Sequence, residues 1–196
     1  MVTNNSFYSY AELKAMGFKK FGKSVLVSRN AKFYGINKIE LGDNVRIDDF
    51  CILSGNIKIG SHIHISAGVY IFAGNSLVEL EDFVTVSSRT SIYAISDNYL
   101  GDVLTNSCID DEFKDIITQK VTLKMFSIVG SGSTILPGIV VETGAAVGAN
   151  SLVTKSIPEW QIYAGSPAKK IKNRSKKMLE LKNKFLEKFE EREKND

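Results

Sequence analysis

The chain has few of the residues from which covalent cross-links and metal centres are usually built. Its 196 residues include two cysteines, Cys51 and Cys108, and two histidines, His62 and His64. Two cysteines give neither a disulfide framework nor the spacing of a metal site, so we expect free thiols in a reducing cytoplasm. Long apolar runs are also missing, which argues against a membrane-spanning segment. The opening residues, MVTNNSFYSY, have no basic and no apolar region, so no secretory signal is expected.

The composition is that of an ordinary globular chain, and its basic charge is concentrated at one end. Hydrophobic residues make up 43% and charged residues 24%, which predicts one domain with a sizeable core. Residues 169–196 hold 11 Lys or Arg against 6 Asp or Glu, although the whole chain carries a net charge of only +3. This segment is either a solvated helix face or a surface that attracts anions such as nucleotide phosphates. No nucleic-acid-binding motif accompanies it, so no nucleic-acid partner is expected.

Aliphatic residues recur every six positions over most of the chain. One block runs from Leu41 to Leu77, a second from Leu80 to Ile92, and a third from Leu123 to Val153. A long helix would show a period of 3.6 and an ordinary strand a period of two, so neither explains the pattern. A period of six is typical of short strands joined by sharp bends, three to a coil, in which successive coils stack. The sequence therefore predicts an all-β core, a parallel β-helix of hexapeptide repeats.

Three segments fall outside the repeat. Ser9 followed by Glu12 is a capping box, which predicts a short helix over residues 9–16 that covers the first coil. Residues 94–120 are too polar and too long for a turn and are expected to form a protruding functional loop. Beyond residue 171 the apolar residues follow a helical period and fall largely on one face. We therefore expect an N-terminal cap (1–24), a β-helix domain (25–168, with the loop at 94–120) and a basic C-terminal helix (169–196) that packs on protein and does not insert stably into a membrane.

The runs IGSHIHIS and VGANSLVTKSIPEWQIYAGSPAKKI resemble the hexapeptide-repeat acyltransferases. The sequence is most similar to the galactoside, maltose and nodulation O-acetyltransferases and to their relatives in surface-polysaccharide gene clusters. The similarity covers about residues 25 to 172. It implies a left-handed β-helix, a homotrimer in the cytoplasm, acetyl-CoA as the co-substrate, and sugar acceptors bound between subunits. The implied activity is transfer of an acetyl group to a sugar hydroxyl in the synthesis of cell-surface polysaccharide or lipopolysaccharide.

The residue that should act as the catalytic base is missing from its usual place. A hydroxyl nucleophile needs a base, and in the family this is a histidine just after the segment equivalent to SIYAIS. Asp97 stands there in this chain. The base is therefore His64, His62, Asp97, or absent. Alternation along a strand directs His64 outward and leaves His62 beside a bend, so His64 is the leading candidate. Asp97 then orients the imidazole or binds a sugar hydroxyl, because a carboxylate is a weak base unless it is desolvated.

The resemblance also implies substrate-binding and cofactor-binding residues. Ser66 matches a position that contacts the acceptor, and Asn98 and Tyr99, next to Asp97, are expected to bind substrate as well. The positions that match the family's CoA groove and its cationic phosphate contacts are Ser131, Ala149, Thr154, Lys169 and Lys172. No metal is expected to be required.

Two other functions are compatible with this fold. The acceptor could be the amine of a nucleotide-linked amino sugar, which would need less help from a base and would fit the missing histidine. The chain could also be a trimeric binding or scaffold protein that has lost catalysis. The metal-dependent carbonic anhydrases of the same fold need three histidine ligands, and this chain has two histidines.

Overall fold

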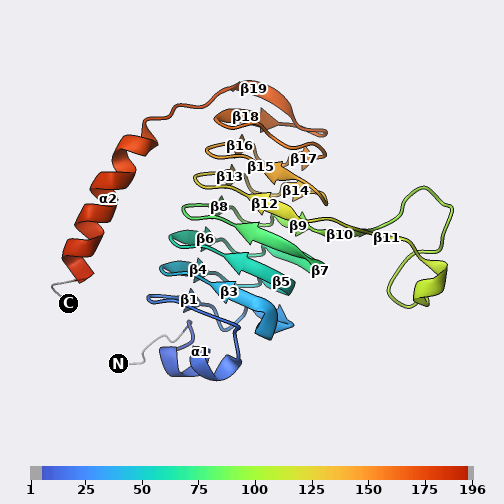
Figure 1. Cartoon of the computed structure of the whole chain (residues 1–196), viewed down its shortest axis with the longest axis horizontal. Coiled ribbons are helices and arrows are strands. Elements are labelled where there is room, and N and C mark those ends of the chain that lie inside the picture. Colours follow the sequence, from blue (N-terminus) through green and yellow to red (C-terminus); the bar gives the residue numbers. More distant parts are fainter. Residues whose placement is uncertain (1–5, 194–196) are drawn as a thin grey trace.

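The computed structural model describes residues 6–193, with side chains as far as residue 189, and shows a parallel β-helix with a short helix at its N-terminal end and a longer helix along its side (Figure 1). Short strands wind into stacked coils, and each coil contributes one strand to each of three faces. This architecture agrees with the predicted hexapeptide-repeat fold.

Parallel pairing between successive coils builds the three faces. The first face contains β1 (Leu26–Val27), β4 (Val45–Ile47), β6 (Ile63–Ile65), β8 (Thr85–Val86), β13 (Ile128–Val129), β16 (Ala146–Val147) and β18 (Gln161–Ala164). The second contains β2 (Lys32–Tyr34), the first parts of β5 (Ile52–Ile59) and β7 (Tyr70–Leu80), then β9 (Ser91–Tyr93), β14 (Thr134–Ile135) and β17 (Leu152–Val153). The third contains β3 (Ile39–Leu41), the later parts of β5 and β7, then β12 (Val121–Leu123) and β15 (Val140–Val141).

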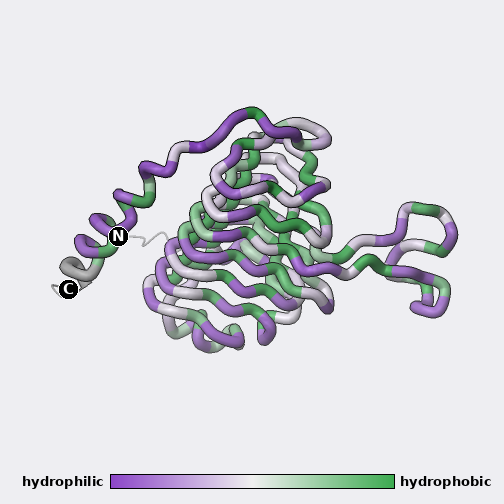
Figure 2. The backbone as a smooth tube through the Cα atoms, turned by 45° about the horizontal axis from the view of Figure 1, so that its top comes forward, coloured by the Kyte–Doolittle hydropathy of each residue, from purple (hydrophilic) through white to green (hydrophobic). Residues whose placement is uncertain are grey.

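The period of six places one aliphatic side chain of each strand on the central axis. Ile47, Ile65 and Val86 lie in successive strands of the first face, and all three are fully buried. The apolar bands stack from coil to coil along the tube (Figure 2). Such burial stabilises coils whose strands are too short to be stable alone.

Leu77 is an exception to the predicted register. It is only half-buried, whereas Val78 and Leu80 are buried and pair with Ile57 and Ile59 of the coil below. The chain makes an enlarged corner at residues 73–77, and the repeat resumes at Val78. The frame shift that the sequence indicates is therefore real, but it falls before Leu77.

The corner between the second and third faces differs in length from coil to coil. In the first coil this corner contains a 3-10 turn (η1, Ile36–Lys38). In a later coil it contains the enlargement at residues 73–77, and in the next coil it contains residues 94–120. In that long insertion, β10 (Ile95–Asp97) and β11 (Ile116–Thr118) pair antiparallel, and the tip includes a second 3-10 turn (η2, Asp111–Phe113). The hairpin projects away from the β-helix, as predicted for a protruding loop (Figure 1).

Ion pairs and close packing fix the base of this hairpin. Glu79 accepts hydrogen bonds from Lys120 (2.7 Å) and Lys58 (2.8 Å), which hold the pKa of its carboxyl below the usual range. Ile95 lies directly over Gly74, where an added Cβ would approach within 2.7 Å of the Ile95 side chain. The insertion is therefore anchored to the coil beneath it on two sides.

The N-terminal cap is the short helix α1 (Tyr10–Met16), as the capping box predicts. The Ser9 side chain accepts from the Glu12 backbone, and the Glu12 carboxylate accepts from the Ser9 backbone at 2.7 Å. Arg29 donates to both Glu12 oxygens at 2.8 Å. The Ser9 backbone, the Ser9 hydroxyl and Arg29 together lower the pKa of Glu12 to about 2. Leu13 is buried against the first coil, so the open end of the β-helix is covered.

The C-terminal segment contains both a strand and a helix. Residues 169–173 form β19, which adds antiparallel to β18, and the helix α2 spans Met178–Glu193, so the expected helix starts later than residue 169. Arg174, between them, donates to the backbone oxygens of Phe126 (2.8 Å) and Gly144 (2.9 Å). Burial of its guanidinium lowers the pKa of Arg174. No helix within residues 6–193 is long and apolar enough to cross a membrane.

Helix α2 packs on a column of rings at the corner that precedes the first face. His62, Phe83 and Phe126 stack there, with centroids 4.9 Å and 5.2 Å apart, and each adopts a left-handed φ between 58° and 63°. Phe185 and Phe189 of α2 meet His62 edge-on, each at 5.3 Å. The apolar face of α2 therefore packs on its own β-helix.

Candidate active site

The hairpin β10–β11 and the second face enclose a cleft of about 1120 Å³. Its lining residues come from the hairpin, from the rings on β7 and β9, and from the coils that follow the insertion. They are Phe72, Tyr93, Ile95, Ser96, Asp97, Tyr99, Asn106, Ser107, Lys114, Ile116, Ile117, Gln119, Thr134, Leu136, Pro137, Leu152 and Thr154. A volume of this size suits a small-molecule ligand.

The cleft is apolar against the β-helix and polar toward the tip of the hairpin. Phe72 and Tyr93 stack at 5.4 Å on the second face, and Leu136 and Leu152 follow on the later coils. Two charged residues, Asp97 and Lys114, are among the lining residues, and both belong to the hairpin. An uncharged part of a ligand therefore fits next to the β-helix and a charged part fits next to the hairpin.

Asp97, predicted to be catalytic, and Tyr99, predicted to bind substrate, both line this cleft. Asp97 ends β10, is half-buried, and accepts a hydrogen bond from the Asn106 backbone at 3.3 Å. Tyr99 is on the rim with 89% of its surface exposed. Asn98 bonds to Asp115 (3.0 Å) and to the Leu100 backbone (2.8 Å) and is not among the lining residues. Its role in the hairpin is to fix the turn after β10.

His64 lies on the first face, away from the cleft of its own chain. It projects outward between the buried Ile63 and Ile65, as alternation predicts, and 46% of its side chain is exposed. Its Nε2 lies 2.7 Å from Asp48 Oδ2. The carboxylate that orients this imidazole within the chain is therefore Asp48, whereas the sequence suggested Asp97 for that role.

Asp48 also holds Arg46, which donates from Nε at 2.7 Å. Partial burial raises the pKa of Asp48, but the hydrogen bonds from Arg46 and His64 outweigh it and the net shift is downward. The carboxylate is thus held ionised beside the imidazole, the arrangement that orients catalytic histidines. His62, the other candidate base, is in the ring column under α2 and contributes to packing.

The expected cofactor residues lie at two places on the later coils. Ser131 and Ala149 are stacked at the corner between the first and second faces, where the Asn150 backbone donates to the Ser131 oxygen at 2.8 Å. Gly130 brings these coils close, since a Cβ there would approach within 2.6 Å of the Ala149 nitrogen. Thr154 is exposed at the end of β17 and lines the cleft.

Lys169 and Lys172, the expected phosphate contacts, are both exposed on β19, the last strand of the first face.

Ser66 follows β6 at the same corner as Ser131, and its backbone oxygen accepts from the buried thiol of Cys51 at 3.2 Å. Burial raises the pKa of Cys51 to about 11, so this thiol is a packing residue. Within one chain, therefore, the cleft brings together Asp97, Tyr99 and Thr154. Asn98 lies on the hairpin outside the lining, and the other predicted site residues lie on or beside the first face.

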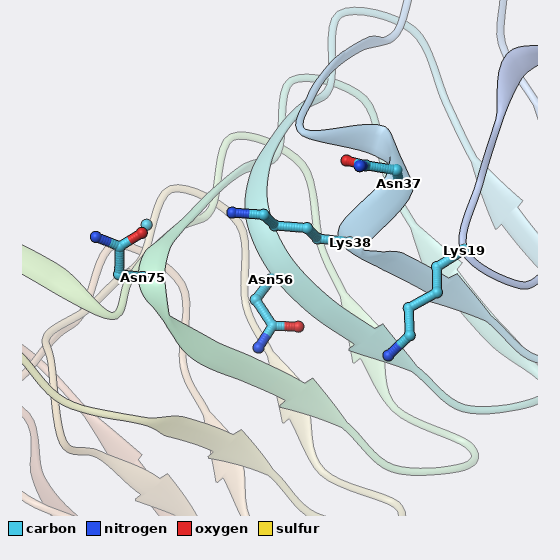
Figure 3. Close-up of a pocket in the computed structure, with 6 residues that line it drawn as sticks. Lys19, Asn37, Lys38, Asn56 and Asn75 are labelled. Atoms are coloured by element: carbon cyan, nitrogen blue, oxygen red, sulfur yellow. The ribbon is translucent and has the colours of Figure 1, made fainter.

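A second, smaller hollow of about 360 Å³ lies at the enlarged corner below the hairpin (Figure 3). Asn37, Asn56 and Asn75 come from three successive coils, with Lys38 and Lys19 beside them. Lys19 is paired with Glu40 at 2.6 Å. The hollow is polar and shallow, and none of the predicted site residues lines it.

Several residues of the site were missed in the sequence. Asp48 lies two residues after Arg46, which pairs with His64, so a coil of 18 residues would have placed Asp48 opposite Ser66 and close to His64. Phe72 and Tyr93 are neighbours in register across the second face, but the insertion at 73–77 changes their spacing to 21. Lys114 carries no periodic signal, because the pairing of β10 with β11 decides its position.

Among residues 6–189, whose side chains the structure describes, no group of three or more His, Cys, Asp or Glu side chains is arranged to hold a metal ion. The stacked six-residue repeats, the helix over the first coil and the cleft under one long insertion define a parallel β-helix protein of the hexapeptide-repeat type.

Comparison with known proteins gives the family. Residues 38–73 match the family described as bacterial transferase hexapeptide (six repeats). A dTDP-4-amino-4,6-dideoxy-D-glucose acyltransferase of Escherichia coli is 41% identical over 177 residues, which are 89% of this chain and 92% of that protein. AntD, an N-acyltransferase of Bacillus cereus solved with dTDP and 3-hydroxybutyryl-CoA, is 46% identical with a TM-score of 0.93, covering 95% of this chain and 99% of its own. The chain belongs to the hexapeptide-repeat transferase family, and it is an acyltransferase.

A more distant relative carries a different acceptor chemistry in its name. WbbJ of Escherichia coli K12, named as a lipopolysaccharide biosynthesis O-acetyl transferase, is 29% identical over 136 residues, which are 67% of this chain and 66% of WbbJ. The more similar relatives are thus named for amino-sugar or N-acyl transfer and the more distant one for O-acetyl transfer.

Proposed function

We propose that the protein transfers an acyl group from a coenzyme A thioester to the 4-amino group of a dTDP-linked 4-amino-4,6-dideoxy sugar. The observation that carries this proposal is the polar end of the cleft, where Asp97 supplies a carboxylate. A carboxylate attracts an ammonium group, whereas a hydroxyl acceptor needs a stronger base. The 41% and 46% identical relatives, named for an amino-sugar acceptor and for N-acylation, support the same choice.

In this mechanism Asp97 binds the acceptor amine and accepts its proton. The amine nitrogen, once deprotonated, attacks the thioester carbonyl carbon and forms a C–N bond. The tetrahedral intermediate collapses, the C–S bond breaks, and the sulfur of CoA leaves as a thiolate that takes up the second proton lost by the attacking nitrogen. Asp97 releases the first proton to solvent. The products are the amide and free CoA thiol. Backbone N–H groups beside the thioester would stabilise the oxyanion.

The donor would approach the cleft from the later coils. Thr154, at the cleft, and the corner of Ser131 and Ala149 would hold the pantetheine arm, and Lys169 and Lys172 would attract the phosphates of CoA. The AntD complex with 3-hydroxybutyryl-CoA supports a donor site that accepts acyl groups larger than acetyl. The apolar rings of Phe72 and Tyr93 offer a matching surface for such a chain.

We propose that the complete site forms in a homotrimer. His64, Asp48 and Ser66 are on or beside the first face and the cleft is on the second, so the two sets of residues meet only if the first face of one subunit lies against the cleft of another. Light scattering that gives a stable monomer near 21.7 kDa at micromolar concentration would contradict this assembly.

O-acetylation of a sugar is the second candidate, and the oriented pair of His64 and Asp48 favours it. An imidazole at 2.7 Å from a carboxylate is the base that a hydroxyl acceptor requires. In this alternative His64 of one subunit would serve the cleft of its neighbour.

A matched pair of acceptors separates the two chemistries. We would assay dTDP-4-amino-4,6-dideoxyglucose and dTDP-6-deoxyglucose, which differ at C4 only, by release of CoA thiol and by the mass of the product. The proposal expects the amine to be favoured by at least about 100-fold in kcat/KM, because the site would recognise the charged nitrogen. Acylation of the hydroxyl compound alone would support the O-acetyl alternative. CoA binding without turnover of either acceptor would indicate a binding protein.

A further inference from the structure

Lys114 is a nearly buried cation in the wall of the cleft. It follows the η2 turn at the tip of the hairpin, and only 7% of its side chain is exposed. Its Nζ lies 3.0 Å from Asp111 Oδ1, and the Asp111 side chain is 95% exposed. An ion pair with such an exposed partner, three residues away in sequence, contributes little to the stability of the fold. The burial of a lysine at this place is thus not explained by its contact with Asp111 alone.

The hairpin presents Lys114 on the same side as Asp97. Ile116 pairs directly with Asp97, and side chains two apart on a strand share a face, so Lys114 follows Ile116 toward the tip on the side that lines the cleft. One anionic and one cationic side chain thus lie at the polar end of an otherwise uncharged cleft.

This pattern of charge matches the acceptor of the proposed function. A nucleotide-linked 4-amino sugar carries an ammonium at C4 and a diphosphate at C1, on opposite sides of the sugar ring. A carboxylate suits the first group and a lysine suits the second. The free sugar would use only the carboxylate.

We propose that Lys114 binds the diphosphate of the nucleotide-linked acceptor while Asp97 binds its amine. The inference rests on the proposed function and adds a residue that distinguishes a nucleotide-linked sugar from the free sugar. Asp111 then keeps Lys114 in place until the acceptor arrives, and the exposed carboxylate is displaced at little cost.

The test compares three variants with the wild-type enzyme on two acceptors. Lys114→Met removes the charge and keeps the length, Lys114→Arg keeps the charge, and Asp111→Asn weakens the internal ion pair while leaving Lys114 intact. KM and kcat/KM are measured for dTDP-4-amino-4,6-dideoxyglucose and for 4-amino-4,6-dideoxyglucose without the nucleotide. KM for the acyl-CoA donor and the calorimetric affinity for dTDP alone are measured in parallel.

We expect Lys114→Met to raise KM for the nucleotide-linked acceptor by about 10- to 100-fold, the usual effect of losing a charge-assisted hydrogen bond. Its dTDP affinity should fall by a similar factor, while KM for acyl-CoA and turnover of the free sugar stay near wild type. Lys114→Arg should recover most of the loss, and Asp111→Asn should bind the acceptor as well as wild type or better.

Equal losses on both acceptors, or an Asp111→Asn variant as impaired as Lys114→Met, would overturn the inference and assign Lys114 to holding the hairpin together. Failure of the proposed function is a different result: wild-type enzyme would then acylate neither amine. In that case the affinity for dTDP still tests whether Lys114 binds a diphosphate. A decrease in dTDP affinity in Lys114→Met alone supports a diphosphate site, and an unchanged dTDP affinity refutes it.

Discussion

The substitution Asp97→Asn tests the centre of the proposed mechanism with little change of shape. The asparagine keeps an oxygen that can accept from the Asn106 backbone, a contact of 3.3 Å in the native chain, so the turn after β10 should hold. What disappears is the negative charge at the end of the cleft and the ability to take a proton. A loss of activity therefore reports on chemistry and not on folding of the hairpin.

The half-buried position of Asp97 sets the size of the effect. A hydrogen bond between ionised groups contributes about 1.5–3 kcal/mol, which corresponds to about 10- to 150-fold in kcat/KM. Loss of a general base costs about 10²- to 10⁴-fold. If Asp97 both holds the ammonium and takes its proton, we expect a decrease of at least about 100-fold with KM for acyl-CoA unchanged.

The assay is steady-state release of CoA thiol with the 4-amino sugar nucleotide as acceptor. Asp115→Asn is the matched control, because it makes the same chemical change on the same hairpin at a residue that contacts Asn98 and does not line the cleft. His64→Ala should lower activity toward the amine far less than Asp97→Asn. An Asp97→Asn enzyme within about twofold of wild type would refute the reasoning, and a larger loss in His64→Ala would transfer the role of base to the pair of His64 and Asp48.

Three further predictions concern the donor, the coils and the N-terminal cap. Lys169→Glu with Lys172→Glu should raise KM for acyl-CoA several-fold in steady-state kinetics, with a smaller effect in high salt, and an unchanged KM would make these lysines a solvated surface. Gly144→Ala should destabilise the fold by about 2–4 kcal/mol in thermal unfolding, because φ is +66° and an added Cβ would lie 2.5 Å from the Trp160 ring. Glu12→Gln should lower the unfolding temperature at neutral pH, since the native pKa of Glu12 is lowered from 4.5 to about 2; this difference should shrink as the pH falls below 4.5 and vanish near pH 2.

The fold was predictable because its cause is local and repeated. Each coil must place an aliphatic residue on the axis every six positions, so residues such as Ile47 and Ile65 carry the signal in sequence. The capping box of α1 is equally local, with Ser9 and Glu12 three residues apart. Leu77 was wrongly predicted to lie on the axis. The period shows that the repeat shifts its frame, but it does not show at which residue the shift occurs.

The site was less predictable because it depends on contacts across coils. His64 was correctly expected to point outward, but its partner Asp48 comes from the preceding coil. His62 was expected beside a bend, yet its packing against Phe185 of α2 joins residues far apart in the chain. Lys114 reaches the cleft through the pairing of the hairpin, which no pattern in the sequence encodes.

The corner that carries residues 94–120 holds a long insertion without disturbing the core. At that corner the chain leaves the second face and returns to the third, and β9 and β12 still pair with β7 on either side of 27 intervening residues. Because the loop-closure entropy rises only slowly with length, the core tolerates inserts of very different size there. We therefore expect the segment between residues 94 and 120 to be exchangeable. Transplanting it between related enzymes should carry over the choice of acceptor while the coils, and the donor site proposed on them, remain those of the host.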